Sequence, residues 1–182
     1  MQIIVRVRGT PEDYLVAQKH SDMARPHQCP NCSAVKSLVA LGYYKRWLTG
    51  VDGKDLELSI RRFRCRACER TVSLLPDFAQ PYRLVRNEAI ERYFSGRAEH
   101  TELRRNADLL RCYWRRFTRW LPKLRCAIGI AFGRSPPASQ PRKWWAFLMD
   151  TTGNLERATR RMVERSRVTV FGRYRCHQPR PL

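Results

Sequence analysis

Cys29-Pro30-Asn31-Cys32 and Cys65-Arg66-Ala67-Cys68 are two matched cysteine pairs separated by 32 residues. The two residues inside each pair allow both sulfurs to turn toward one ion, and four thiolates at this spacing are typical of a tetrahedral metal site. We therefore predict one structural zinc ion bound by Cys29, Cys32, Cys65 and Cys68. A disulfide framework or buried free thiols are the alternatives, and His27 is interpreted as a neighbour of the site rather than a ligand.

The segment between the pairs predicts a β-hairpin. Residues 37–48 are rich in strand formers and aromatic residues, and residues 56–63 alternate apolar and polar side chains. Residues 49–54 contain two glycines, which can adopt the positive φ angles of a turn. Two cysteine knuckles joined by such a hairpin indicate a zinc ribbon, in which metal binding rather than a large core stabilises the unit.

The composition predicts a polyanionic partner. The chain of 182 residues carries 36 Lys+Arg against 16 Asp+Glu, a formal net charge of +20. Such a charge costs self-repulsion in a compact fold, and arginine forks match phosphate groups and guanine edges. A solvated basic surface is the alternative. The codon bias of a GC-rich genome would explain the ratio of arginine to lysine but not the net charge. A membrane surface is disfavoured, because no long basic amphipathic helix and no apolar run of membrane-spanning length is found.

Two groups of arginines are the predicted nucleic-acid contacts. The group around the second cysteine pair suits phosphate contact, or else forms a basic rim that offsets the charge of a metal–thiolate centre; it consists of Arg61, Arg62, Arg64, Arg66 and Arg70. The other group lies on one face of a helix predicted over residues 109–121 and consists of Arg111, Arg115, Arg116 and Arg119.

Residues 87–121 predict a helix-turn-helix arrangement. Helices are expected over residues 88–95, about 101–105 and 109–121, with Asn106 as a left-handed turn residue, Asp108 as the third cap and Pro122 as the end. A helix, a tight turn and a basic third helix are the parts of a major-groove reader. A plain solvated basic face is the alternative.

We expect an α+β fold with four parts along the chain. These are a strand and helix docking on the ribbon (1–26), the zinc ribbon (27–80), a helix-turn-helix-like helical domain (87–132), and a linker, helical segment and basic tail (133–182). Thr10 and Asp13 indicate a capping box for the first helix. Separate helices are expected over 123–132 and around 155–165, and Cys112 and Cys126 are interpreted as buried small hydrophobes.

Residues 29–81 resemble the N-terminal zinc ribbon of bacterial insertion-sequence transposases and of related zinc-ribbon/helix-turn-helix proteins. The matching positions are Cys29-Pro30-x-Cys32, Gly42-Tyr43-Tyr44-x-Arg46, and Arg61-Arg62-x-Arg64-Cys65-x-x-Cys68-x-x-Thr71-x-Ser73-x-Leu75-Pro76, with a looser match at Trp114-Arg115-Arg116-Phe117. The resemblance implies recognition of element ends or of an operator. It does not carry over catalysis: residues 144–149 look like an apolar strand ending at Asp150, but only 32 residues follow. We expect Asp150 to be a helix cap or a surface residue.

The leading hypothesis is a non-catalytic, zinc-dependent protein that binds duplex DNA, as a transposon-associated accessory protein or regulator. A truncated or two-part transposase or nuclease is one alternative, with the catalytic carboxylates on a separate transposase polypeptide. An RNA-binding zinc ribbon is another, because exposed aromatic residues could stack on single-stranded bases. We expect a cytoplasmic, nucleoid-associated protein, because paired CxxC motifs and an odd number of cysteines suit a reducing compartment. A homodimer is left open.

Overall fold

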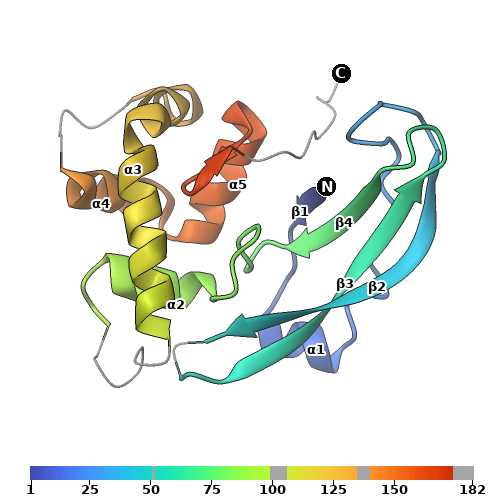
Figure 1. Cartoon of the computed structure of the whole chain (residues 1–182), viewed down its shortest axis with the longest axis horizontal. Coiled ribbons are helices and arrows are strands. Elements are labelled where there is room, and N and C mark those ends of the chain that lie inside the picture. The colour runs from blue at the N-terminus through green and yellow to red at the C-terminus, as the bar shows by residue number, and fades with distance from the viewer. Residues whose placement is uncertain (51, 99–105, 135–139, 174–182) are drawn as a thin grey trace.

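The chain has an α+β fold in which a mixed β-sheet and a group of helices lie side by side (Figure 1). The structure is a computed structural model that describes residues 1–50, 52–98, 106–134 and 140–173. Four strands form the sheet in the order β1-β4-β3-β2: β1 (Gln2–Val5), β2 (Leu38–Thr49), β3 (Asp55–Cys65) and β4 (Thr71–Pro76). β1 runs parallel to β4, whereas the β4–β3 and β3–β2 pairs are antiparallel.

The long β2–β3 hairpin confirms the two strands expected between the cysteine pairs. Its register runs from Leu38 opposite Cys65 to Thr49 opposite Asp55, with an irregularity between Ala40 and Gly42. Of the two turn glycines, Gly53 has a positive φ of 72° and Gly50 does not. The first cysteine pair precedes β2 and the second begins at the last residue of β3, so the hairpin brings both pairs to the same end of the sheet.

The N-terminal segment packs on the ribbon through backbone pairing and one helix. α1 (Pro11–Val16) begins with the expected capping box, in which the Thr10 hydroxyl accepts from Asp13 N and the Asp13 carboxylate accepts from Thr10 N. Tyr14 is fully buried under the sheet, and its hydroxyl donates to Ser59 O at 2.9 Å. A helix of six residues is too short to be stable alone, so this burial holds it in place.

Four helices and a small hairpin form the second layer. They are α2 (Asn87–Phe94), α3 (Ala107–Phe132), α4 (Pro141–Thr152), α5 (Leu155–Ser166), and the strands β5 (Val168–Thr169) and β6 (Gly172–Arg173). α2 and α5 confirm two of the expected helices. The short helix expected at about 101–105, most of the linker at 135–141 and the basic tail after 173 lie outside the described residues.

The helix with the basic face is longer than its sequence indicated. It does not end at Pro122 but continues to Phe132, so the separate helix expected over 123–132 is its second half. Pro122 is exposed, whereas Leu121, Leu124 and Ile128 are buried in the helical core. Burial of these side chains on both sides of the proline outweighs the roughly 3 kcal/mol that an interior proline costs a helix.

Two further local predictions for this layer are wrong. Asn106 has a φ of −113° and is itself the N-cap of α3, so it is not left-handed and Asp108 is not the cap. The apolar run at 144–149 lies in α4, not in a strand, because Pro141 begins a helix there and Gly153 ends it in the left-handed conformation. Asp150 lies exposed on this helix, in agreement with its interpretation as a surface residue.

The helical core is built around Phe94. Its ring lies 4.8 Å from that of Trp145 and 4.9 Å from that of Trp114, both edge-on, and 5.8 Å from that of Phe117. Phe171, in the turn of the β5–β6 hairpin, completes the cluster with its ring 6.0 Å from Phe94. Edge-to-face aromatic packing of this kind adds to simple area burial. The Phe171 ring also lies 5.6 Å from that of Tyr113 on α3, so Phe171 anchors the hairpin to both α2 and α3.

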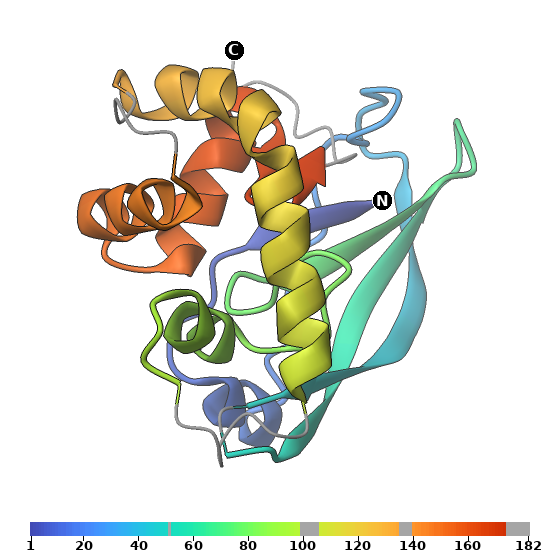
Figure 2. The same ribbon diagram turned by 60° about the vertical axis from the view of Figure 1, so that its left-hand side comes forward.

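A buried connection joins the sheet to the helices (Figure 2). All of residues 76–81 are buried. Asp77 accepts from Val7 N and pairs with Arg160 of α5 at 3.1 Å, and Gln80 exchanges hydrogen bonds with Thr159 of α5. The guanidinium of Arg46 on β2 donates to Gln80 O and to Arg83 O. These bonds fix how the helical layer sits relative to the ribbon.

Candidate metal centre and arginine surfaces

The two cysteine knuckles have the same backbone geometry. In each, the first cysteine's N–H donates to the carbonyl five residues later: Cys29 N to Ala34 O and Cys65 N to Arg70 O, both at 3.0 Å. In each, the residue four positions after the first cysteine is left-handed, with φ of 60° at Ser33 and 56° at Glu69. Such tight turns direct both sulfurs of a knuckle to one side.

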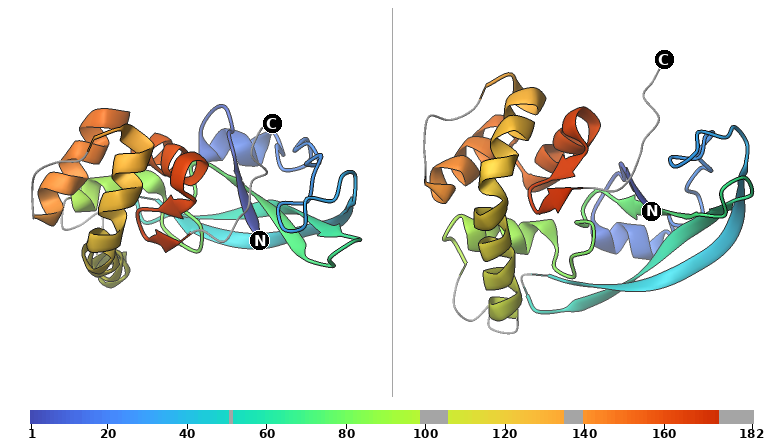
Figure 3. Two further views of the ribbon diagram at one scale, coloured as in Figure 1. Left: turned by 90° about the horizontal axis from the view of Figure 1, so that it is seen from above. Right: turned by 45° about the horizontal axis from the view of Figure 1, so that its top comes forward.

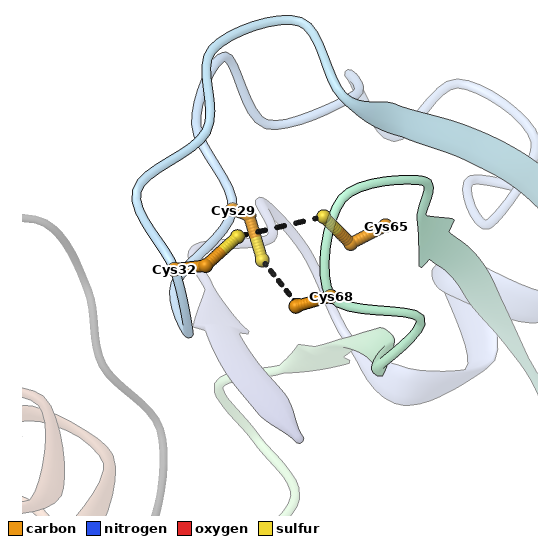
Figure 4. A group of neighbouring side chains, drawn as sticks. All are labelled: Cys29, Cys32, Cys65 and Cys68. Atoms are coloured by element: carbon orange, nitrogen blue, oxygen red, sulfur yellow. Dashed lines mark hydrogen bonds between the residues drawn. The ribbon is translucent and has the colours of Figure 1, made fainter.

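The four predicted ligands form one cluster (Figure 4). Their sulfur atoms all lie within 4.8 Å of one another, and the shortest distances cross between the knuckles, at 3.7 Å for Cys29–Cys68 and 3.7 Å for Cys32–Cys65. These distances are far longer than the roughly 2.05 Å of a disulfide, and all four cysteines are free. The cluster could therefore hold one metal ion. His27 is exposed and does not belong to it.

The thiols of the two knuckles differ in acidity. The hydrogen bond between the Ser37 hydroxyl and the Cys65 sulfur, 3.2 Å apart, is the main cause that lowers the pKa of Cys65 to about 6. The Arg70 N–H is the main cause that lowers the pKa of Cys68. Burial raises the pKa of Cys29. For Cys32, the Ala34 N–H lowers the pKa, but burial and the three neighbouring thiols outweigh it and raise the pKa to about 12.

This pattern follows from crowding of like charges. Four sulfurs so close together cannot all become thiolates without a compensating cation, so ionisation of one pair suppresses ionisation of the other. A divalent cation at the centre would remove that repulsion and favour four thiolates. The donor set, its spacing and its electrostatics therefore all fit a metal ion.

The arginines near the second knuckle are not equally available. Arg61 lies over the Tyr43 ring at 4.8 Å and donates to its hydroxyl, and Arg62 lies 5.7 Å from the Tyr44 ring centroid. Arg64 pairs with Glu69 at 2.8 Å. The exposed side chains of Arg66 and Arg70 have no ion-pair or hydrogen-bond partner among the described residues. These two are the free cations of the knuckle.

The arginines of α3 likewise include some with a partner and some without one among the described residues. Arg111 pairs with Asp108 at 2.8 Å, and Arg116 Nε donates to Phe171 O at 2.7 Å. Within the described ranges, the exposed side chains of Arg115 and Arg119 have no such partner. The structure does not bring the two predicted groups together, because the knuckles and α3 lie at opposite ends of the molecule (Figures 1 and 3). They form two separate basic surfaces.

Three features of the basic and thiol residues were not predicted from the sequence. Arg46 is buried and holds the connection between the layers, so it is not available to a ligand. α5 carries a row of exposed arginines at four-residue steps, Arg157, Arg161 and Arg165, a spacing that could have been found in the sequence. Cys112 and Cys126 are exposed on α3, so their interpretation as buried residues is wrong.

Comparisons with known proteins find a similarity to a family model that assigns no activity. Residues 29–116, which contain both knuckles, the hairpin and the first part of α3, match a family model described as a domain of unknown function (DUF6431). No curated protein and no solved structure is significantly similar to the chain. The resemblance to transposase zinc ribbons thus stays a prediction. Within the described ranges, no helix is long and apolar enough to cross a membrane.

Proposed function

We propose that the chain is a zinc-dependent, non-catalytic DNA-binding protein. The observation that carries the proposal is the tetracysteine cluster, which holds the knuckle bearing Arg66 and Arg70 at the end of the sheet. A tetrahedron with zinc–sulfur bonds of about 2.3 Å has sulfur–sulfur edges of about 3.8 Å. The two shortest sulfur–sulfur distances of 3.7 Å agree with that geometry, and an all-thiolate set favours zinc over harder cations.

Duplex DNA is the proposed partner because of how charge is distributed. The net charge is +20, and the unpaired arginines point outward from both ends of the molecule. Arg115 and Arg119 are one turn apart on the exposed face of α3, a spacing that suits phosphates or guanine edges in a major groove. The proposed biological role is a bacterial transposon-associated accessory protein or regulator, which rests on the sequence resemblance.

Binding and its salt dependence test this proposal. We expect the zinc-loaded chain to shift a fluorescent duplex, with affinity that falls steeply as salt rises, since each neutralised phosphate releases counterion. Replacing both Arg115 and Arg119 by alanine should reduce the slope of log K against log salt by about 2. Arg111→Ala is the matched control, because Arg111 is already paired with Asp108 on the same helix. Affinity that stays flat with salt would contradict the proposal.

The metal and the absence of catalysis are tested separately. Cys65→Ser should lose zinc and weaken DNA binding, whereas Cys126→Ser, on α3, should keep both. Strand cleavage by the chain alone in the presence of Mg²⁺ would overturn the non-catalytic assignment and favour a nuclease or transposase component.

RNA is the second candidate partner, and one surface favours it. Tyr43 and Trp47 on the edge strand β2 are 43% and 53% exposed. Lys45 lies between these two residues on the same strand. Aromatic and cationic side chains on one face can stack and hold unpaired bases. Competition between labelled duplex DNA and structured RNA decides between the two partners.

A further inference from the structure

The β5–β6 hairpin lies beside α3 (Figure 1). A pocket lies between the two. Its volume is about 570 Å³, within the range of small-molecule sites. The lining combines three arginines, two aromatic residues, a cysteine and a glycine: Arg115, Arg116, Arg119, Trp120, Phe171, Cys112 and Gly172. The basic face of α3 is therefore also one wall of a concave site.

The charges of this pocket select an anion. Of the described residues that line it, none is acidic. Arg116 is held in place by its bond to Phe171 O, whereas Arg115 and Arg119 have no partner among the described residues. Like charges four residues apart on a helix repel each other. An anion bound between Arg115 and Arg119 would remove this repulsion and accept hydrogen bonds from both guanidinium groups.

The other lining residues provide an aromatic wall. The indole of Trp120 is half-buried, and its Nε1 is shielded from solvent without a hydrogen-bond partner in the described part of the chain. Gly172 has a φ of +133°, and a Cβ there would lie 3.6 Å from Arg116 Nη2 and 4.0 Å from the Trp120 ring. A side chain at this position would narrow the pocket and strain the backbone, so glycine keeps the aromatic wall accessible.

We propose that this pocket binds an unpaired nucleotide, with its phosphate between Arg115 and Arg119 and its base against Trp120. A phosphate beside a planar ring matches guanidinium groups beside an indole, and stacking of this kind is tolerant of base identity. The proposal rests on the proposed nucleic-acid binding and deepens it, because it adds a site for one unpaired nucleotide to the contacts with duplex DNA. A free nucleoside monophosphate and a nucleotide within a single strand share this chemistry.

Two exposed cysteines on α3 provide the test. Cys112 lines the pocket and Cys126 does not. Alkylation of Cys112 by N-ethylmaleimide in the zinc-loaded full chain therefore reports whether the pocket is occupied, and alkylation of Cys126 is the internal control. The probes are a short single-stranded oligonucleotide, deoxyadenosine monophosphate, inorganic phosphate and a fully paired duplex. Peptide mapping by mass spectrometry gives the alkylation rate of each cysteine.

The single strand is expected to slow alkylation of Cys112 and to leave Cys126 unchanged, with stronger protection than the paired duplex gives. Protection by the monophosphate but not by the oligonucleotide would assign the site to a free nucleotide and overturn the nucleic-acid form of the proposal. Protection by inorganic phosphate equal to that by the monophosphate would show that the base does not bind, and would also overturn it.

A variant of Trp120 separates stacking from charge. Trp120→Leu keeps an apolar side chain. We expect it to raise the probe concentration that half-protects Cys112 by about tenfold, which is in the lower range for loss of one stacked base. Unchanged protection in a variant with unchanged melting temperature and zinc content would refute the role of the ring. If duplex binding persists while Cys112 reacts equally with and without single strand, this inference fails and the proposed function stands.

Discussion

Arg46 joins the ribbon to the helical layer, and its replacement by methionine probes that joint directly. Only 7% of the residue is exposed, and its guanidinium donates to two backbone carbonyls, Gln80 O at 2.6 Å and Arg83 O. Both acceptors belong to the connection that leads from β4 to α2. Burial lowers the pKa of Arg46, which is the sign of a desolvation cost paid by the charged group.

The expected loss of stability follows from these opposing terms. Two hydrogen bonds from a charged donor contribute about 1.5–3 kcal/mol each, and their removal leaves two carbonyls without this donor. Methionine retains the packing of the aliphatic stem and no longer carries a buried charge, which recovers part of that loss. We expect Arg46→Met to lower the free energy of unfolding by about 2–4 kcal/mol.

Urea unfolding of the zinc-loaded protein, followed by far-UV circular dichroism, measures this change. Lys45→Met is the matched control, because Lys45 is the neighbouring residue on β2 and makes only an exposed pair with Glu57 at 2.7 Å. Such a pair contributes at most about 1 kcal/mol. The reasoning is refuted if Arg46→Met unfolds within about 0.5 kcal/mol of the wild type, or loses no more stability than the control.

Three further predictions concern the metal, the pH dependence and the helical core. Removal of metal with a chelator should accelerate amide exchange around Cys29 and Cys65 while α3–α5 stay protected, and equal protection with and without metal would contradict this. Burial, followed by the hydrogen bond and charge of Asp77, raises the pKa of Glu156 from 4.5 to about 7. The folded state therefore keeps a proton that the unfolded state loses, so stability falls as pH rises from about 4.5 to about 7. After allowance for solvent screening, Glu156→Gln should remove about 1 kcal/mol of this decline, and an unaltered pH profile of thermal unfolding would count against it. Phe94→Ala should cost about 3–5 kcal/mol in unfolding free energy, because the buried ring is the centre of the aromatic cluster, and a loss below about 1 kcal/mol would mean that the site collapses around the cavity.

Local patterns in the sequence predicted the metal cluster and the hairpin well. The CxxC spacing fixes how the two sulfurs of a knuckle can point, and strand alternation with a glycine-containing turn fixes the hairpin between the pairs. The capping box of α1 is equally local, since its two partners are Thr10 and Asp13. In each case the interacting residues are close in sequence or joined by one regular element.

Predictions that depended on distant contacts were less successful. Pro122 is a local stop signal for a helix, yet burial of Leu121, Leu124 and Ile128 against the rest of the core carries α3 through it. Cys112 lies in an apolar stretch, yet it is exposed, because the buried face of α3 is set by which elements pack against it.

The sequence by itself determined that four thiols converge and that the chain carries a large excess of arginine. Only the tertiary structure decided which arginines remain free, because partners such as Glu69 and Phe171 O are brought to them by the turn of the knuckle and by the packing of the hairpin on α3. The tertiary structure also forms the pocket on α3, because Phe171 and Gly172, which complete its lining, come from a segment about fifty residues away along the chain. Composition fixes the sum of the charges, whereas folding fixes which of them are neutralised by neighbours and which face a ligand.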